Sequence, residues 1–93
     1  MRTIEWTSQF KRDYKRELRG RYRAVLDEYL FPVVDCLAKD QPLESRYRDH
    51  PLCGNWKDHR DCHIKPDLVL IYQMVDTDII RLVRLGSHSE IGL

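Results

Sequence analysis

The hydrophobic positions at the start of the chain predict a short strand followed by a helix. Residues Thr3–Trp6 alternate weakly, as a strand does, and Thr7 can cap a helix by accepting a hydrogen bond from a free amide. The next apolar residues lie four apart and form one inward-facing stripe: Phe10, Tyr14 and Leu18. Gly20 then stands where a left-handed C-cap is needed, so we expect the helix to end there in a tight turn.

A second helical pattern begins at Arg21. Its apolar residues recur at helical spacing up to Leu37, and residues 39–42 form the exit. Pro32 interrupts the pattern, because proline lacks an amide donor and clashes with the preceding turn. We therefore expect a kink or a break near Leu30 and Phe31.

The hydrophobic period changes after Pro42. Residues 61–65, 68–74 and 79–85 are short apolar or alternating runs, which predict strands. The polar connections at 65–67 and 75–78 are short enough for hairpins, so neighbouring strands should pair antiparallel. The expected fold is α+β: a short first strand and a two-helix hairpin packed on one face of a small antiparallel sheet, with the other face free for function.

Composition indicates a soluble globular chain that forms one domain over residues 1–93. Hydrophobic residues make up 42% and charged residues 33%, and a chain of this length buries only one modest core. No apolar run approaches the roughly 20 residues of a membrane span, and the first ten residues lack the apolar core of a signal peptide. Three cysteines form no disulfide pattern. We expect a cytoplasmic protein with free thiols and no membrane partner.

The positive charge is concentrated in the first helix and the turn after it. The net charge of the chain is only +1, but residues 9–23 hold seven bases and two acids. Such a stripe can contact nucleic acid, or it can be a solvated helix face. The charge pattern alone leaves both readings open.

Residues 50–67 concentrate chemically reactive side chains: three histidines, two cysteines and three aspartates. Cys53, His59, Cys62 and His63 include enough nitrogen and sulfur ligands for zinc. Strand alternation, however, sends Cys62 and His63 to opposite faces, so no metal site is predicted. The spacing of Cys53 and Cys62 matches no redox motif, and we expect core cysteines.

Alternation also groups Asp61, His63 and Lys65 on one face of their strand. This polar set could carry acid–base chemistry, or it could be a solvated face. On the last strand, Arg81 and Arg84 stand an odd number of residues apart and should face opposite sides. Only one of these two arginines should then join the polar set.

Five stretches carry a resemblance to a known family. They are residues 47–52 (YRDHPL), 54–57 (GNWK), 60–67 (RDCHIKPD), 70–72 (LIY) and 84–88 (RLGSH). In this order and spacing the chain resembles toxins of the RelE superfamily, and specifically those of its YafQ branch.

The resemblance implies a toxin of a type II toxin–antitoxin system that acts as a ribosome-dependent endoribonuclease. It implies attack of the ribose 2′-OH on the adjacent phosphate, without a metal or other cofactor. The implied partners are mRNA on the 70S ribosome, with its ribosomal RNA, and a cognate antitoxin of the DinJ type. Operator DNA would be bound only through the antitoxin complex. The alternative is a RelE-fold binding module that has lost catalysis and acts only through antitoxin-dependent operon repression.

The resemblance also assigns roles to individual residues. It implies His88 as general acid, His50 or His63 as general base, Asp67 as an orienting or proton-accepting carboxylate, and Arg84 as the phosphate clamp. The expected RNA-binding residues are Lys11, Lys15, Arg16, Lys57 and Arg60. Two aromatic positions of the family are absent here, because no aromatic residue follows His88 and Leu68 follows Asp67 where a relative has tryptophan. Base stacking at these positions is therefore in doubt.

Overall fold

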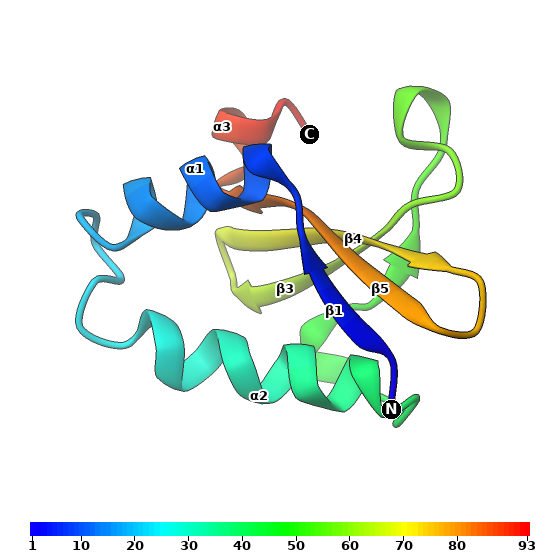
Figure 1. Cartoon of the computed structure of the whole chain (residues 1–93). Helices are drawn as coiled ribbons and strands as arrows, with labels where there is room; N and C mark the ends of the chain where they lie inside the picture. Colours follow the sequence, from blue (N-terminus) through cyan, green and yellow to red (C-terminus); the bar gives the residue numbers. More distant parts are fainter.

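The computed structural model describes residues 1–93 and has the predicted α+β architecture (Figure 1). Its elements in chain order are β1 (Thr3–Trp6), α1 (Ser8–Glu17), α2 (Leu26–Ala38), η1 (Ser45–Tyr47), β2 (His50–Pro51), η2 (Gly54–Trp56), β3 (Arg60–Lys65), β4 (Leu68–Val75), β5 (Ile79–Gly86) and α3 (His88–Ile91). Every predicted strand is present. No helix is long and apolar enough to cross a membrane.

The five strands form one mixed sheet in the order β1-β5-β4-β3-β2. The strands β2 to β5 make the predicted antiparallel meander. β1 lies parallel to β5 at the opposite edge, with Thr3 beside Ile79, so the sheet is not wholly antiparallel. A parallel pair needs a long crossover, which α1, α2 and the meander together supply.

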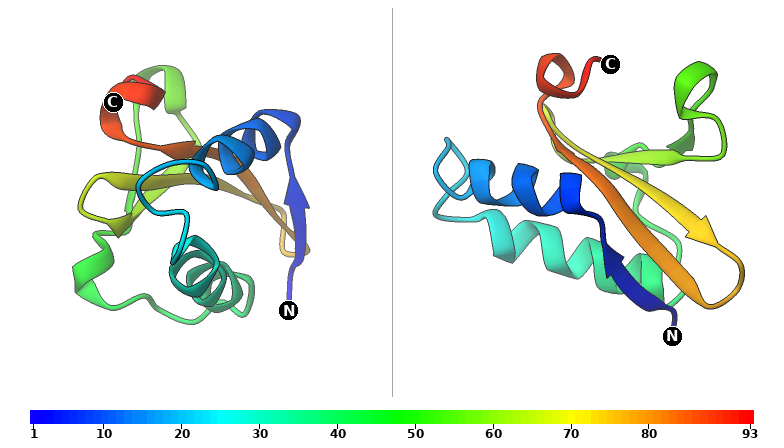
Figure 2. Two further views of the ribbon diagram at one scale, coloured as in Figure 1. Left: turned by 90° about the vertical axis from the view of Figure 1, so that its left-hand side faces the viewer. Right: turned by 45° about the horizontal axis from the view of Figure 1, so that its top comes forward.

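The two main helices cover one face of the sheet, as predicted (Figure 2). Phe10 of α1 and the apolar side of α2 pack against a row of buried sheet residues that includes Leu70, Tyr72 and Leu82. The other face is not free, contrary to the prediction. Ile91 of α3, together with Leu52 and Trp56 from the β2–β3 connection, covers Val69 and Ile71 in a second small cluster.

The helix boundaries depart from the sequence pattern in the connection between α1 and α2. Thr7 caps α1 as predicted, accepting a hydrogen bond from the Phe10 amide at 3.1 Å. Gly20 does not adopt a left-handed conformation, because short-range amide bonds to the Arg16 and Glu17 carbonyls close the end of the helix. α2 then begins at Leu26, not at Arg21, after a run of turns.

Pro32 does not break α2, so the break expected near Leu30 and Phe31 is wrong. The helix continues to Ala38, with Leu30, Val33 and Leu37 buried on its inner side. Pro32 lies on the exposed side, where water can satisfy the carbonyl that the missing amide leaves unpaired. Packing of the inner side therefore outweighs the local cost of the proline.

Two β-bulges change which residues share a face of the sheet. One shifts the register between His63 and Lys65, so that Lys65 pairs with the core residue Leu68 and lies on the helix side. Lys65 is thus separated from Asp61 and His63, contrary to the prediction. The other bulge lies at residues 82–84 of β5. It places Arg81 opposite Gln73 and Arg84 opposite Ile71, and these two arginines therefore share a face instead of opposing each other.

Candidate active site

The structure brings His50, His63, Asp67 and His88 together on the face of the sheet opposite α1 and α2. His50 of β2 lies opposite Asp61 of β3, and His63 is two residues further along β3 on the same side. The ring centre of His63 lies 6.5 Å from that of His50 and 5.1 Å from that of His88. Three imidazoles thus form a row along the sheet.

Strand pairing explains why Asp67 and His88 meet although they lie 21 residues apart. Val69 near the start of β4 pairs with Gly86 at the end of β5, so the residues just outside the two strands are neighbours. Asp67 accepts a hydrogen bond from the His88 ring nitrogen Nδ1 at 2.8 Å and another from the His88 amide at 3.1 Å. A carboxylate can only accept, so Nδ1 carries the proton and Nε2 is left for chemistry.

A capping box fixes the start of α3 and with it the backbone of His88. The Ser87 hydroxyl accepts from the Glu90 amide at 3.1 Å, and the Glu90 carboxylate accepts from the Ser87 amide at 2.8 Å. A Cβ at Gly86 would lie 2.6 Å from the Arg16 guanidinium and 3.3 Å from the Cβ of Glu90, so a larger residue there would have to displace the Arg16 side chain. The Gly86-Ser87-His88 sequence therefore fits this tight approach of β5 to α1 and α3.

His50 is held at both ring nitrogens. Nδ1 lies 2.6 Å from the Arg48 carbonyl oxygen and must donate to it. Nε2 lies 3.1 Å from Oδ1 of Asp61, which is an ion-pair distance without the geometry of a hydrogen bond. Asp61 is only 3% exposed. The buried Asp61 carboxylate therefore faces the His50 ring without a hydrogen bond to it.

The cluster shifts the ionisation of three of its members. Burial raises the pKa of Asp61, and the charges of the three histidines offset only part of this. Burial lowers the pKa of His63 below its ordinary 6.5; the Asp61 carboxylate opposes that shift, and the positive charges of His88, Arg48 and His50 add to it. The hydrogen bond from the His88 side chain lowers the pKa of Asp67.

The two adjacent imidazoles have different surroundings, which suit them to different parts in proton transfer. The lowered pKa of His63 favours the neutral ring, and this ring makes no hydrogen bond, so it can accept a proton. The Asp67 carboxylate orients the His88 ring through Nδ1, so Nε2 of the doubly protonated ring is placed to donate one. A proton acceptor and a proton donor thus lie side by side.

Arg84 is not brought to the histidines. Its Nε donates to the buried Asp13 carboxylate of α1 at 2.7 Å, and the same carboxylate accepts from the Leu85 amide at 3.0 Å. Arg16 joins this cluster through Asp13 at 3.0 Å and through the Leu85 carbonyl at 2.7 Å. Asp13 and Arg16 thereby pair with the edge of β5 beyond the end of β1, and this arrangement gives both arginines structural partners.

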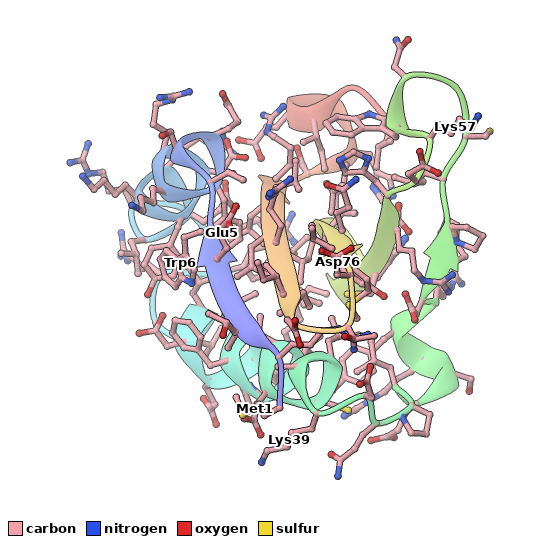
Figure 3. The ribbon with its side chains drawn as sticks, turned by 45° about the vertical axis from the view of Figure 1, so that its right-hand side comes forward. Met1, Glu5, Trp6, Lys39, Lys57 and Asp76 are labelled. Carbon is pink, nitrogen blue, oxygen red and sulfur yellow. The ribbon has the colours of Figure 1, made fainter.

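The predicted RNA-binding residues divide into two groups. Lys11, Lys15 and Lys57 are exposed and make no ion pair, and Figure 3 shows Lys57 on the projecting β2–β3 loop. Arg16 is also bonded to Glu17 and Glu90, each at 3.0 Å. Arg60 lies 3.4 Å from Asp49, whose carboxylate accepts from the Tyr72 hydroxyl. Only the three lysines are therefore free to meet a polyanion.

Sequence reasoning missed two residues of the site. Asp61 was placed on the histidine face but was not chosen as a functional residue, and Arg48 was noted only as part of a motif. Arg48 has a left-handed backbone (φ 50°), which is uncommon outside glycine and turns its carbonyl to His50. Only the pairing of His50 with Asp61 could have revealed these contacts, and a strand of two residues gives little pattern.

The cysteines do not converge. Cys62 is fully buried on the helix side, Cys53 is exposed and Cys36 is half-buried. The expectation of core cysteines therefore holds for Cys62 and is wrong for Cys53. His59 lies on the β2–β3 connection with its ring against Trp56, away from the row of imidazoles. Leu68 is buried in the core, so it leaves no surface for base stacking beside Asp67.

Comparison with known proteins shows the family to which the chain belongs. Residues 2–92 match a family described as "Bacterial toxin of type II toxin-antitoxin system, YafQ". The chain is 34% identical over 90 residues to the mRNA interferase toxin YafQ of Escherichia coli strain K12, covering 97% of this chain and 95% of that protein.

Solved structures agree along almost the whole chain. A metal-bound toxin from Helicobacter pylori is 46% identical, with a TM-score of 0.87 over 98% of this chain and 99% of that chain. YafQ in the E. coli DinJ–YafQ complex is 34% identical, with a TM-score of 0.81 over 98% of each chain. The resemblance seen in the sequence is confirmed: the chain belongs to the YafQ family of toxins from bacterial type II toxin–antitoxin systems.

Proposed function

We propose that this protein is an endoribonuclease that cleaves mRNA on the translating ribosome. The observation that carries the proposal is the pairing of His63, which makes no hydrogen bond, with a His88 held by Asp67, at 5.1 Å between ring centres. Cleavage of RNA by its own 2′-OH needs one proton acceptor and one proton donor on either side of a phosphate. The named activity of the E. coli relative, an mRNA interferase, is of the same class.

The reaction assigned to the site is an intramolecular transesterification, in which the 2′ oxygen replaces the 5′ oxygen on phosphorus. His63 takes the proton of the 2′-OH, and the 2′ oxygen forms a bond to phosphorus. The bond from phosphorus to the 5′ oxygen breaks, and Nε2 of His88 gives its proton to that oxygen. The products are a 2′,3′-cyclic phosphate and a free 5′-OH. All the residues needed are side chains of this chain, and no cofactor takes part in these steps.

The remaining residues orient and neutralise. Asp67 fixes the orientation of the His88 ring, and the Asp61 carboxylate counters the effect of burial on the pKa of His63. We assign to Arg48 the role of stabilising the negative charge that develops on the phosphate. Arg48 lies close enough to His63 for its charge to lower the pKa of that ring. Arg84, the clamp expected from the sequence, is already paired with Asp13.

The proposed partners follow from the family and from the free lysines. The ribosome would be held through phosphates of its RNA by Lys11, Lys15 and Lys57, which supply affinity without reading sequence. YafQ of E. coli has been crystallised with DinJ, and we propose an antitoxin of that type for this chain. Operator DNA would be reached only through that complex.

The test is primer extension on an mRNA translated with the purified protein, comparing wild type, His88→Ala and His59→Ala. Wild type and His59→Ala should cut within the coding frame, and His88→Ala should lose activity by about 100-fold or more, since general acid catalysis contributes about 10²- to 10⁴-fold. Circular dichroism of each variant checks the fold. A folded His88→Ala protein that still cuts at the wild-type rate would overturn the assignment, and wild type that binds ribosomes without cutting would favour a binding module.

A further inference from the structure

A pocket of about 370 Å³ opens on the helix side of β3, directly beside the active site. Its walls come from α2, from η1 and the residue after it, and from the end of β3 with its turn. It is lined by Tyr29, Arg46, Tyr47, Arg48, His63, Ile64, Lys65 and Pro66. Its volume falls in the range of about 300 to 1,000 Å³ that small-ligand sites occupy. His63 belongs both to this pocket and to the row of imidazoles.

The pocket is positively charged. Three of its lining residues are cations and none is acidic. Arg48 and Lys65 make no ion pair, and Arg46 lies only within 3.6 Å of the exposed Glu44. Such a concentration of unneutralised charge favours an anionic occupant.

The pocket also offers aromatic surface. Lys65 Nζ lies 3.3 Å from the centre of the Tyr29 ring, and the Arg46 guanidinium lies 4.8 Å from the centre of the Tyr47 ring. Bases of single-stranded RNA stack on aromatic rings and on guanidinium planes. Cations interleaved with tyrosines are thus suited to a nucleotide, which has both a phosphate and a base.

Two irregular features of the backbone build this pocket next to the catalytic residues. The β3 bulge turns Lys65 to the helix side while His63 stays on the other face. The left-handed Arg48 places its carbonyl against His50 and keeps its side chain at the pocket wall. Each feature joins the pocket to the row of imidazoles within one short segment: residues 63–65 in β3, and residues 48–50 at the start of β2.

We infer that this pocket binds one nucleotide of the mRNA immediately next to the scissile phosphate. The inference rests on the proposed function and extends it to a specific subsite. Arg48, at the wall nearest the site, faces the scissile phosphate, Lys65 holds the other phosphate of that nucleotide, and its base packs against Tyr47 and Arg46. This surface supplies the stacking that the chain lacks after His88 and at Leu68.

The experiment is a double-mutant cycle between the protein and the RNA. Ribosomes are programmed with mRNAs that carry an abasic nucleotide on the 5′ or on the 3′ side of the cleavage point, and single-turnover cleavage is measured. For one of the two positions, loss of the base should slow wild type by about 10-fold, the scale expected for one stacked base. The same loss should slow Tyr47→Leu by less than about 2-fold, because the stacking surface is already missing.

A second, charge-neutralising variant guards against misfolding of Tyr47→Leu, whose ring packs against the core. Lys65→Gln should raise the half-saturating toxin concentration by about 3-fold or more, because it removes a phosphate contact. The matched control Lys39→Gln, at the far end of α2, should not (Figure 3).

Equal losses in wild type and a folded Tyr47→Leu at both positions, with Lys65→Gln unchanged, would overturn the subsite. In that case His88→Ala would still abolish cleavage and the proposed function would stand. Failure of wild type to cleave any intact mRNA would overturn the function and the subsite together.

Discussion

At the scale of single residues, the proposed chemistry depends on two histidines, His63 and His88, that have different neighbours. His63 is partly buried and unbonded, so its pKa falls below 6.5, whereas His88 is fixed to the exposed Asp67. Asp61 moderates the shift at His63, because a nearby carboxylate favours the protonated ring. The division between acceptor and donor is therefore a property of the neighbours.

The surroundings of His63 predict how its imidazole titrates. In wild type, its imidazole signals should titrate by NMR with a midpoint below 6.5. In Asp61→Asn the midpoint should fall further, because the variant removes the carboxylate that favours the charged form. The acid limb of the cleavage rate should move to lower pH in the same variant, since a general base works only when it is deprotonated. A wild-type midpoint above 6.5, or an upward shift in Asp61→Asn, would contradict the account.

The sequence allowed prediction of residue identities better than of residue contacts. His50, His63, Asp67 and His88, which the family resemblance singled out, come together because β2 pairs with β3 and β4 pairs with β5. Arg84 was expected beside them, but Asp13 of α1 holds it. A charged residue on a helix gives no sign in the sequence that it will be buried against a strand 71 residues away.

At the scale of elements, the edge of β5 depends on side chains of α1. Beyond Leu82, β5 has no strand beside it on the β1 side, and Asp13 and Arg16 take the Leu85 amide and carbonyl instead. Asp13 is 1% exposed and is also the partner of Arg84. Loss of the Asp13 charge leaves Arg84 without its ion-pair partner and weakens the acceptor of the buried Leu85 amide.

Asp13→Asn should therefore lower the free energy of unfolding by about 3 kcal/mol, as expected for a buried pair that loses one charge. Urea denaturation of the purified variant measures this. The control is Asp35→Asn, which breaks the exposed 2.9 Å pair with Lys39 and should cost less than about 1 kcal/mol. Similar losses for both variants would show that the Asp13 cluster does not hold α1 to the sheet.

Elements were predictable where a period repeats, and unpredictable where one residue breaks it. Four strands and two helices follow from hydrophobic spacing, and the Thr7 cap follows from its hydroxyl group. The bulges at Lys65 and near Arg84 each insert one residue, which inverts the facing of everything beyond it. At Pro32 the sequence pattern suggested a break that is not there, because buried contacts along α2 outweigh the unfavourable effect of proline inside a helix.

At the scale of the whole molecule, charge and catalysis lie on different elements. The free lysines Lys11 and Lys15 stand on α1, while the histidines lie on β2, β3 and α3. The parallel pairing of β1 with β5, which no local pattern announces, brings α1 to the end of the sheet that also carries α3 (Figure 1). One segment can thus hold ribosomal RNA while the other acts on the message.

The double variant Lys11→Gln/Lys15→Gln should bind ribosomes more weakly and with a shallower dependence on salt. Each phosphate contact removed lowers the slope of log affinity against log salt by roughly 0.7 to 0.9. Sedimentation with ribosomes at several salt concentrations gives the slope, and saturating toxin should restore the wild-type cleavage rate. An unchanged slope would show that these two lysines contact no phosphate.

The central claim is that the histidine–aspartate cluster cleaves RNA through the message's own 2′-OH. The most direct measurement is single-turnover cleavage of a ribosome-bound mRNA in which the nucleotide before the cut carries 2′-deoxyribose. The account predicts that cleavage at this position disappears, while the all-ribose message is cut to a 2′,3′-cyclic phosphate. Undiminished cleavage of the deoxy message would show that water is the nucleophile and would contradict the roles given to His63 and His88.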